Sequence, residues 1–431
     1  FAAADVSQNV ATTTTSAVGL KVHNKQSANT ANISKYEIKV SASGHSPSYS
    51  ITPSNTASNG TSSIVVGTSP PLVSNKTYNI SHIFLKNIYD LSNSKLTTQS
   101  ATTLPIAPTI FDSSTANTTT TVNFDVSNNN ASNSLDIHTH NVTHSPNANE
   151  TQPVSKSVLG DNRDANAVGL DTQLTDLSAN RTYSITVKNV NSAGMESAAS
   201  SSHNETTLPL APTLSASSTA STTSSVNFDV ANGNENGSLA ISGYKVTHNP
   251  TESITQPVAK TPANTAADAT GVDTQLTGLE ANKTYTITCV NVGSGGDSAS
   301  SSSTTATTLP AAPTLSDSST ANTTSTINVD VTNNNAIGTL AITKNVLSYT
   351  PNGGSTSTAD KNSSGAAHAA NVDTQITGVA ANTQYSITAT NVGVGGTSAA
   401  SGARTEYTLP AAPTFTESSK NTNSITISIN N

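Results

Sequence analysis

Apolar side chains recur with a period of two in short runs along this sequence. In VNFDV at 226–230, two valines and a phenylalanine alternate with asparagine and aspartate. In TYTITC at 284–289, tyrosine, isoleucine and cysteine alternate with threonines. Such runs, separated by Asn, Gly and Ser turns, are typical of antiparallel strands with one buried face. No stretch shows a competing helical period, so we expect an all-β protein.

The same strand pattern returns about every hundred residues. A phrase of the form TLPxAPT is centred on Leu104, Leu208, Leu309 and Leu409, at spacings of 104, 101 and 100 residues. A second phrase keeps nearly the same period: LVSNKTYNI at 72–80, LSANRTYSI at 177–185, LEANKTYTI at 279–287 and VAANTQYSI at 379–387. A fixed period of this kind indicates tandem structural repeats.

The repeat positions predict the domain boundaries. We expect repeat 1 at 1–104, repeat 2 at 105–208, repeat 3 at 209–309, repeat 4 at 310–409, and the start of an incomplete fifth repeat at 410–431. Two strands alone cannot bury a core. The expectation is that the polypeptide continues beyond Asn431; the alternative is that these strands complete a sheet in a neighbouring subunit.

The order of these phrases resembles the fibronectin type III repeat. A proline-bounded start is followed by an alternating strand, by ISGYKVTHNP at 241–250, and by LEANKTYTITCVNVGSGG at 279–296. The resemblance implies a tandem array of antiparallel seven-stranded β-sandwiches, beads on a semi-rigid string. It also implies a tyrosine corner, in which a tyrosine hydroxyl bonds back to the backbone. That role falls to Tyr78, Tyr183, Tyr285 and Tyr385.

One feature of the family is missing. Fibronectin type III domains usually carry a core tryptophan on the second strand, and this chain has no tryptophan. The corresponding region holds Leu20, Phe124, Phe228 and Val329.

Composition narrows the classes of function. Of the 431 residues, 10% are charged and the formal net charge is −8, which argues against nucleic-acid binding and against attraction to an anionic membrane. No apolar run approaches the length of a membrane span, so no direct membrane insertion is expected. A single cysteine, Cys289, excludes an intrachain disulfide framework. We interpret it as a small buried apolar residue.

The densest group of histidines is IHTHNVTH at 137–144. On a regular strand, His138, His140 and His144 would share one face, as a metal site requires. Repeat 3 has Ser242 and Tyr244 at the first two positions. We therefore favour polar residues facing the surface and expect no metal and no cofactor.

The recurring carboxylates do not suggest catalysis. Aspartate recurs once per repeat in two places, at 125, 229 and 330 and at 171, 273 and 373. General acid–base chemistry needs two groups in one cleft. Because no GxSxG nucleophile elbow is present either, we expect structural hydrogen bonds and no catalytic residues.

Three N-x-S/T sequons stand at one position of the repeat, just before the corner tyrosine. They are Asn75, Asn180 and Asn282. We expect an exposed loop there, which makes these asparagines candidate N-glycosylation sites in a secretory context. Glycans are therefore among the expected partners.

Paired prolines mark each predicted boundary. They are Pro105, Pro108, Pro209, Pro212, Pro310, Pro313, Pro410 and Pro413. Two prolines three residues apart restrict the backbone and leave no flexible padding, so the linker should be semi-rigid. Strands of about ten residues span roughly 33 Å, which would give four domains a length of about 130–150 Å.

These features predict a non-enzymatic structural protein of an extracellular space, cell surface or virion surface. It would form or decorate a filament, fibre or sheath, adhesive or not, with itself or other surface structural proteins as partners. One alternative is an accessory spacer or binding region of a longer secreted enzyme, for example a carbohydrate-active one. Another is a receptor ectodomain, which the lack of aromatic or arginine clusters disfavours.

Overall fold

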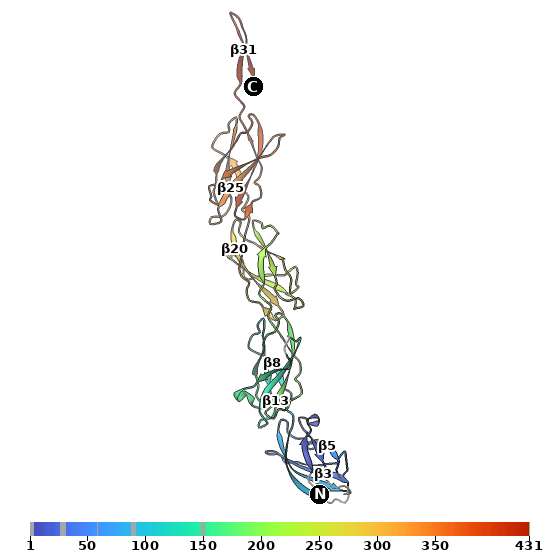
Figure 1. Ribbon diagram of the computed structural model, residues 1–431. Coiled ribbons are helices and arrows are strands. Elements are labelled where there is room, and N and C mark those ends of the chain that lie inside the picture. The colour runs from blue at the N-terminus through green and yellow to red at the C-terminus, as the bar shows by residue number, and fades with distance from the viewer. Residues whose placement is uncertain (1–3, 26–31, 58, 88–91, 148–150, 431) are drawn as a thin grey trace. The chain divides into compact units, whose positions relative to one another are not determined.

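The computed structural model describes residues 4–25, 32–57, 59–87, 92–147 and 151–430. These residues form antiparallel β-strands and two short 3₁₀ turns, Val10–Thr12 and Gly160–Arg163 (Figure 1). No described helix is long and apolar enough to cross a membrane. The chain divides into two compact units, Phe1–Leu208 and Pro209–Asn431, and this division falls at an expected repeat boundary.

The first unit contains two sandwiches of seven described strands each. In the first sandwich a three-stranded sheet has the order β1-β2-β5 and a four-stranded sheet has the order β4-β3-β6-β7. The second repeats this plan with β8-β9-β12 and β11-β10-β13-β14. The bounds are β1 Asp5–Gln8, β2 Val18–His23, β3 Ile33–Ser41, β4 Ser48–Ile51, β5 Thr61–Val66, β6 Thr77–Asn87, β7 Ser92–Thr102, β8 Thr109–Asp112, β9 Val122–Ser127, β10 Ile137–Ser145, β11 Val154–Ser157, β12 Leu170–Leu174, β13 Thr182–Asn191 and β14 His203–Thr206.

The second unit contains two further sandwiches with one additional strand each. A two-residue strand, β21 or β29, pairs with the end of the long strand β20 or β28. The expected count of seven strands therefore does not hold uniformly. The bounds are β15 Thr213–Ala216, β16 Ser225–Ala231, β17 Gly243–Asn249, β18 Val258–Lys260, β19 Val272–Thr277, β20 Thr284–Gly293, β21 Gly296–Asp297, β22 Thr304–Thr307, β23 Thr314–Asp317, β24 Thr326–Thr332, β25 Ile342–Pro351, β26 Ser357–Asn362, β27 Val372–Thr377, β28 Gln384–Gly393, β29 Gly396–Thr397 and β30 Arg404–Tyr407.

The alternation seen in the sequence produces the cores. Along β20 every second side chain from Tyr285 to Cys289 is buried, and the threonines between them are more exposed. Among the residues whose burial is described, the buried apolar side chains form four clusters, and each cluster lies within one expected repeat. Phe124 and Phe228, in the region where the family usually has tryptophan, are fully buried. Burial of such a side chain contributes about 1.5–3 kcal/mol.

The last two strands form a hairpin without a second sheet. β31 (Thr414–Lys420) pairs with β32 (Ile425–Asn430) as β23 pairs with β24 in the preceding repeat. Its apolar side chains, including Phe415, Ile427 and Ile429, are exposed because nothing in the described chain packs on them.

Candidate functional site at the repeat junctions

The four tyrosines proposed for the tyrosine corner are buried in the four cores. Each hydroxyl accepts a hydrogen bond at 2.8–2.9 Å from the backbone N–H five residues earlier. The donors are Val73, Ser178, Glu280 and Ala380. This bond fixes the loop before the tyrosine, and the asparagines at 75, 180 and 282 lie in that loop.

These three asparagines are not exposed. Asn75, Asn180 and Asn282 have exposures of 0%, so the expectation of a surface loop bearing glycans is wrong at all three. Their backbones have φ of 51°, 54° and 57°, in the left-handed region that asparagine tolerates better than most residues. The sequence N-x-T at this position therefore reflects a backbone requirement and a buried amide.

In the first unit, Asn75 joins repeat 1 to repeat 2. Its side-chain amide donates to the carbonyl of Leu135 at 2.6 Å, and the Leu135 N–H donates to the Asn75 carbonyl at 2.9 Å. Asn191 of repeat 2 donates from Nδ2 to Asn75 Oδ1 at 2.8 Å. Asn191 Oδ1 in turn accepts from the N–H groups of Ala193 and Met195, which fixes the Asn191 side chain. Both polar atoms of the Asn75 side chain are therefore hydrogen-bonded to repeat 2.

In the second unit, Asn282 joins repeat 3 to repeat 4 in the same way. The Asn282 amide donates to the Leu340 carbonyl, and the Leu340 N–H donates to the Asn282 carbonyl at 2.9 Å. Repeat 4 has Gly393 at the position of Asn191. Asn282 Oδ1 therefore has no hydrogen-bond partner among the described residues.

Each of the first three proline-bounded linkers is hydrogen-bonded to the repeat that follows it. The N–H of Ile106, between Pro105 and Pro108, donates at 2.8 Å to Asn130 Oδ1. Leu210 and Ala311 make the same bond with Asn234 and Asn335. The six prolines at the first three boundaries are buried, whereas Pro410 and Pro413, before the hairpin, are exposed.

The group of histidines on β10 does not form a metal site. A bulge between Ile137 and Thr139 takes His138 out of the face that holds His140 and His144. Both of these are buried rather than facing the surface, contrary to the expectation. The ring of His144 packs edge-on against the corner residue Tyr183, with centroids 5.5 Å apart.

His140 instead makes a structural hydrogen bond. Its Nε2 lies 2.8 Å from Asn128 Oδ1, and the Asn128 amide donates to the Asp164 carbonyl, so Nε2 carries the hydrogen. In the other repeats the corresponding asparagines accept in the same way: Asn24 from Tyr36, Asn232 from Tyr244 and Asn333 from Asn345. Burial lowers the pKa of His140 to about 4.

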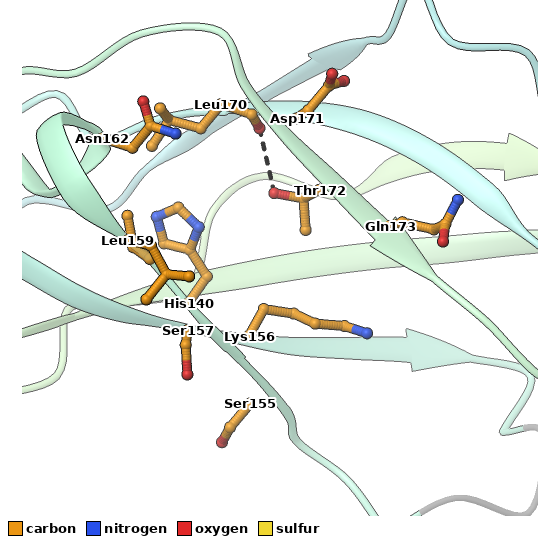
Figure 2. A pocket seen from close by; sticks show the side chains of 11 residues that line it. His140, Ser155, Lys156, Ser157, Leu159, Asn162, Leu170, Asp171, Thr172 and Gln173 are labelled. Carbon is orange, nitrogen blue, oxygen red and sulfur yellow. Dashed lines mark hydrogen bonds between the residues drawn. The ribbon is translucent and has the colours of Figure 1, made fainter.

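A hollow of about 390 Å³ opens beside His140 in repeat 2 (Figure 2). Lys156 and Asp171 line it, and Thr172 donates its hydroxyl hydrogen to the Leu170 carbonyl. One carboxylate and one ammonium at its rim, with a buried neutral imidazole, do not form an acid–base pair.

One of the two recurring sets of carboxylates binds hydroxyl groups of its own repeats, whereas Asp125 Oδ1, in the other set, is buried without a hydrogen-bond partner among the described residues. Asp171 accepts from Ser113, Asp273 from Ser217 and Thr219, and Asp373 from Ser318 and Thr320. The Thr320 and Ser318 bonds lower the pKa of Asp373. Burial raises the pKa of the Cys289 thiol to about 12, which disfavours the reactive thiolate.

Sequence reasoning missed the acceptor side of the junction. The residues that receive Asn75 and Asn282 lie in the short phrases NSLD at 133–136 and GTLA at 338–341, and GSLA at 237–240 is the third copy. The recurring leucine was a usable signal, but it contributes its backbone N–H and carbonyl to the junction. A pattern of side chains in the sequence does not indicate such a backbone contact.

Comparisons with known proteins found matches among solved structures. No family model matches the chain. No curated protein matches it either. Among solved structures, one match is the chicken contactin-1 FN1–FN3 domains, 15% identical, with a TM-score of 0.26, covering 71% of this chain and 99% of that chain. The fold implied by the resemblance to fibronectin type III repeats, an all-β tandem array of antiparallel sandwiches, is the fold observed here.

Proposed function

We propose that this chain is a non-enzymatic structural protein of an extracellular space, a cell surface or a virion surface. It is a rod of four sandwich repeats and the start of a fifth that forms or decorates a filament, fibre or sheath. Its partners are other copies of itself or other structural proteins of that surface.

The junction bonds carry this proposal. In each unit the two repeats are joined by paired backbone and amide hydrogen bonds, at Asn75 with Leu135 and at Asn282 with Leu340. Such bonds give an interface direction as well as affinity, because a small rotation would leave buried amide groups without partners. A repeat protein that only tethers other domains would not need them.

The chemistry of the described side chains fits a non-catalytic role. Asp171, Asp273 and Asp373 bind hydroxyls, the buried His140 and His144 bind amide or backbone oxygens, and the cysteine is buried. Each of these groups is used by its own sandwich.

Small-angle X-ray scattering of the full chain, with negative-stain microscopy of native material, tests the proposal. We expect particles with a maximum dimension close to the sum of the repeat lengths, and fibres or surface layers in native material. The double variant Asn75→Gly, Asn282→Gly keeps the backbone conformation but removes both amides, so it should broaden the distribution of interatomic distances. Dispersed, compact monomers for both proteins would contradict the rod.

A further inference from the structure

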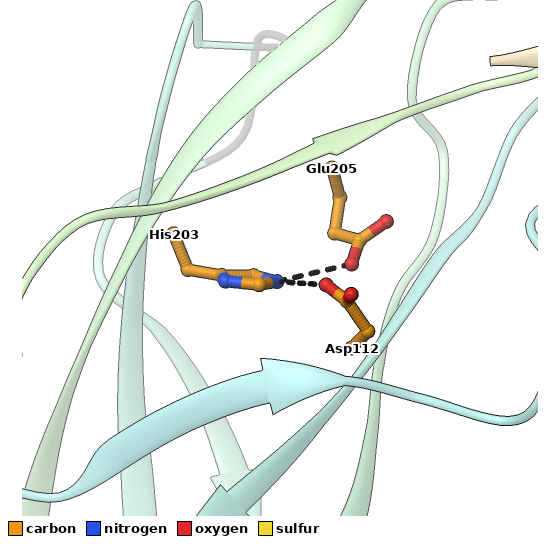
Figure 3. Close-up of side chains that lie close together, drawn as sticks. All are labelled: Asp112, His203 and Glu205. Atoms are coloured by element: carbon orange, nitrogen blue, oxygen red, sulfur yellow. Dashed lines mark hydrogen bonds and ion pairs between the residues drawn. The ribbon is translucent and has the colours of Figure 1, made fainter.

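Three side chains meet at the open edge of the second sandwich (Figure 3). Asp112 ends β8, the edge strand of one sheet, and His203 and Glu205 lie on β14, the edge strand of the other. His203 Nε2 lies 3.1 Å from Glu205 Oε1 and 3.3 Å from Asp112 Oδ1. One ligand atom from each residue falls within 4.8 Å of the others.

The donor atoms are spaced as ligands of one ion. Zinc binds imidazole nitrogen and carboxylate oxygen at about 2.0–2.2 Å, so two ligands of a tetrahedral ion lie about 3.3 Å apart. Because Nε2 faces two acceptors, it carries a hydrogen in the metal-free protein. When a divalent cation binds, the hydrogen on Nε2 leaves to solvent, and the neutral imidazole carries its hydrogen on Nδ1. The cation then meets three donors, with a fourth position open to water.

The site is also held in place. The Glu205 side chain is 12% exposed, His203 is 19% exposed and Asp112 is 90% exposed, so water reaches the site from the side of Asp112. Asn117 donates from Nδ2 to Glu205 Oε2 at 2.7 Å, which leaves Oε1 facing the imidazole. This outer hydrogen bond orients the ligand carboxylate.

Repeat 4 carries the same two carboxylates with a built-in cation between them. Asp317 and Glu406 occupy the positions of Asp112 and Glu205, and Arg404 replaces His203. Arg404 pairs with both, at 2.6 Å from Nε to Glu406 Oε1, and Asn322 orients Glu406 as Asn117 orients Glu205. The imidazole nitrogen of His203, which lies between the two carboxylates, can bind a metal ion, and a guanidinium cannot.

Repeat 3 shows the position without charge. There the three corresponding residues are Ala216, Thr304 and Ala306. The carboxylate pair and the group between them therefore occur together in repeats 2 and 4 and are absent together from repeat 3.

We propose that Asp112, His203 and Glu205 bind a divalent transition ion of the Zn²⁺ class, which clips the two edge strands of repeat 2 as Arg404 clips those of repeat 4. The nitrogen ligand selects Zn²⁺ and its neighbours over Ca²⁺ and Mg²⁺, which prefer oxygen alone. This site is independent of the proposed structural function.

Metal counting on the full chain, without a histidine tag and after chelator treatment, tests the site. Equilibrium dialysis against Zn²⁺ should give one bound ion, and His203→Arg, which copies repeat 4, should abolish it. Arg404→His, which copies repeat 2, should add a second ion. Asn117→Ala should keep the site but weaken it about tenfold or more.

The matched variants separate binding from damage to the fold. Circular dichroism at each substitution should stay unchanged, and excess Ca²⁺ should not displace Zn²⁺. Equal zinc binding by the wild-type chain and His203→Arg would overturn the proposal, as would a wild-type chain that binds no zinc. His203→Arg introduces the ion pairs that Arg404 makes in repeat 4. A loss of zinc binding in this variant therefore cannot be attributed to a lost contact between the two edge strands.

Discussion

The junctions between repeats in the two units differ by one side chain. Both join their repeats through an asparagine with a left-handed backbone, Asn75 or Asn282, and a leucine whose backbone receives it. Asn191 completes the contact in the first unit, whereas Gly393 leaves the side-chain oxygen Oδ1 of Asn282 without a partner among the described residues. The backbone pairing is therefore common to both junctions. Only in the first junction are both polar atoms of the buried asparagine amide hydrogen-bonded.

The largest effect is expected when the asparagine itself is replaced. Asn75→Ala should lower the free energy of unfolding by about 2–4 kcal/mol, because alanine is strained at φ of 51° and the amides of Asn75 and Asn191 lose their bonds. Asn282→Ala should lower the free energy of unfolding by less than Asn75→Ala does, because one fewer hydrogen bond is lost. Urea denaturation of the full chain measures both.

Glycine at the same positions is the matched control. Asn75→Gly and Asn282→Gly remove the amide without the backbone strain. If glycine and alanine variants are equally destabilised at position 75, the left-handed conformation does not contribute and only the lost amide bonds matter there.

A second difference between the units predicts a difference in pH response. The asparagine acceptor of each core is met by His140 in repeat 2 and by Tyr244 and Asn345 in the second unit. Burial holds the pKa of His140 at about 4, below its ordinary 6.5, so the unfolded chain binds more protons between these values. Stability should fall as pH drops from 6.5 towards 4, by up to about 3 kcal/mol.

The variant His140→Asn, which copies Asn345 of repeat 4, isolates this effect. It should remove most of the loss of stability below pH 6.5 while leaving stability at pH 7.5 within about 1 kcal/mol. Thermal unfolding at pH 7.5, 6, 5 and 4 measures it. An unchanged pH profile in the variant would place the acid sensitivity elsewhere in the chain.

The fold could be predicted from the sequence, but the junction could not. Alternation such as that of 284–289 places Tyr285 and Cys289 in a core whatever the surroundings, because the period of a strand is fixed. By contrast, exposure of Asn75 depends on whether another repeat covers it. The single repeat holds no information on this point, and the N-x-T pattern suggested the opposite.

The histidines show a second limit. Counting residues along β10 puts His138 and His140 on one face, but the bulge at Ile137–Thr139 changes the count by one. The Asp112, His203 and Glu205 cluster was invisible for a related reason. Its members come from two strands of different sheets, about ninety residues apart in the sequence.

Making the first junction resemble the second should have an intermediate effect. Asn191→Gly removes the donor to Asn75 Oδ1 and the acceptor of two backbone N–H groups. We expect a loss of about 1–3 kcal/mol, the range for leaving a buried polar group without its partner. Chemical denaturation detects it, and the combination with Asn75→Gly should be clearly less than additive if the two amides act as a pair. Full additivity would mean that Asn191 stabilises only its own turn.

The reverse change, Gly393→Asn, is expected to have the smallest effect. It tests whether the second junction can accommodate a side chain that donates to Asn282 Oδ1. The backbone of Gly393 lies outside the left-handed region, so asparagine is compatible with it. A Cβ there would lie 3.0 Å from Asn282 Oδ1 and 3.2 Å from Pro310 Cγ, so these neighbours must move by a few tenths of an ångström. One new hydrogen bond to Asn282 contributes about 1 kcal/mol, and the crowding offsets part of it, so a gain below about 1 kcal/mol is expected in urea denaturation. Gly393→Ala, which adds the Cβ without the amide, should lose stability by comparison. If alanine and asparagine behave alike, the free oxygen of Asn282 does not limit the second junction, and the two units differ in sequence but not in the strength of their junctions.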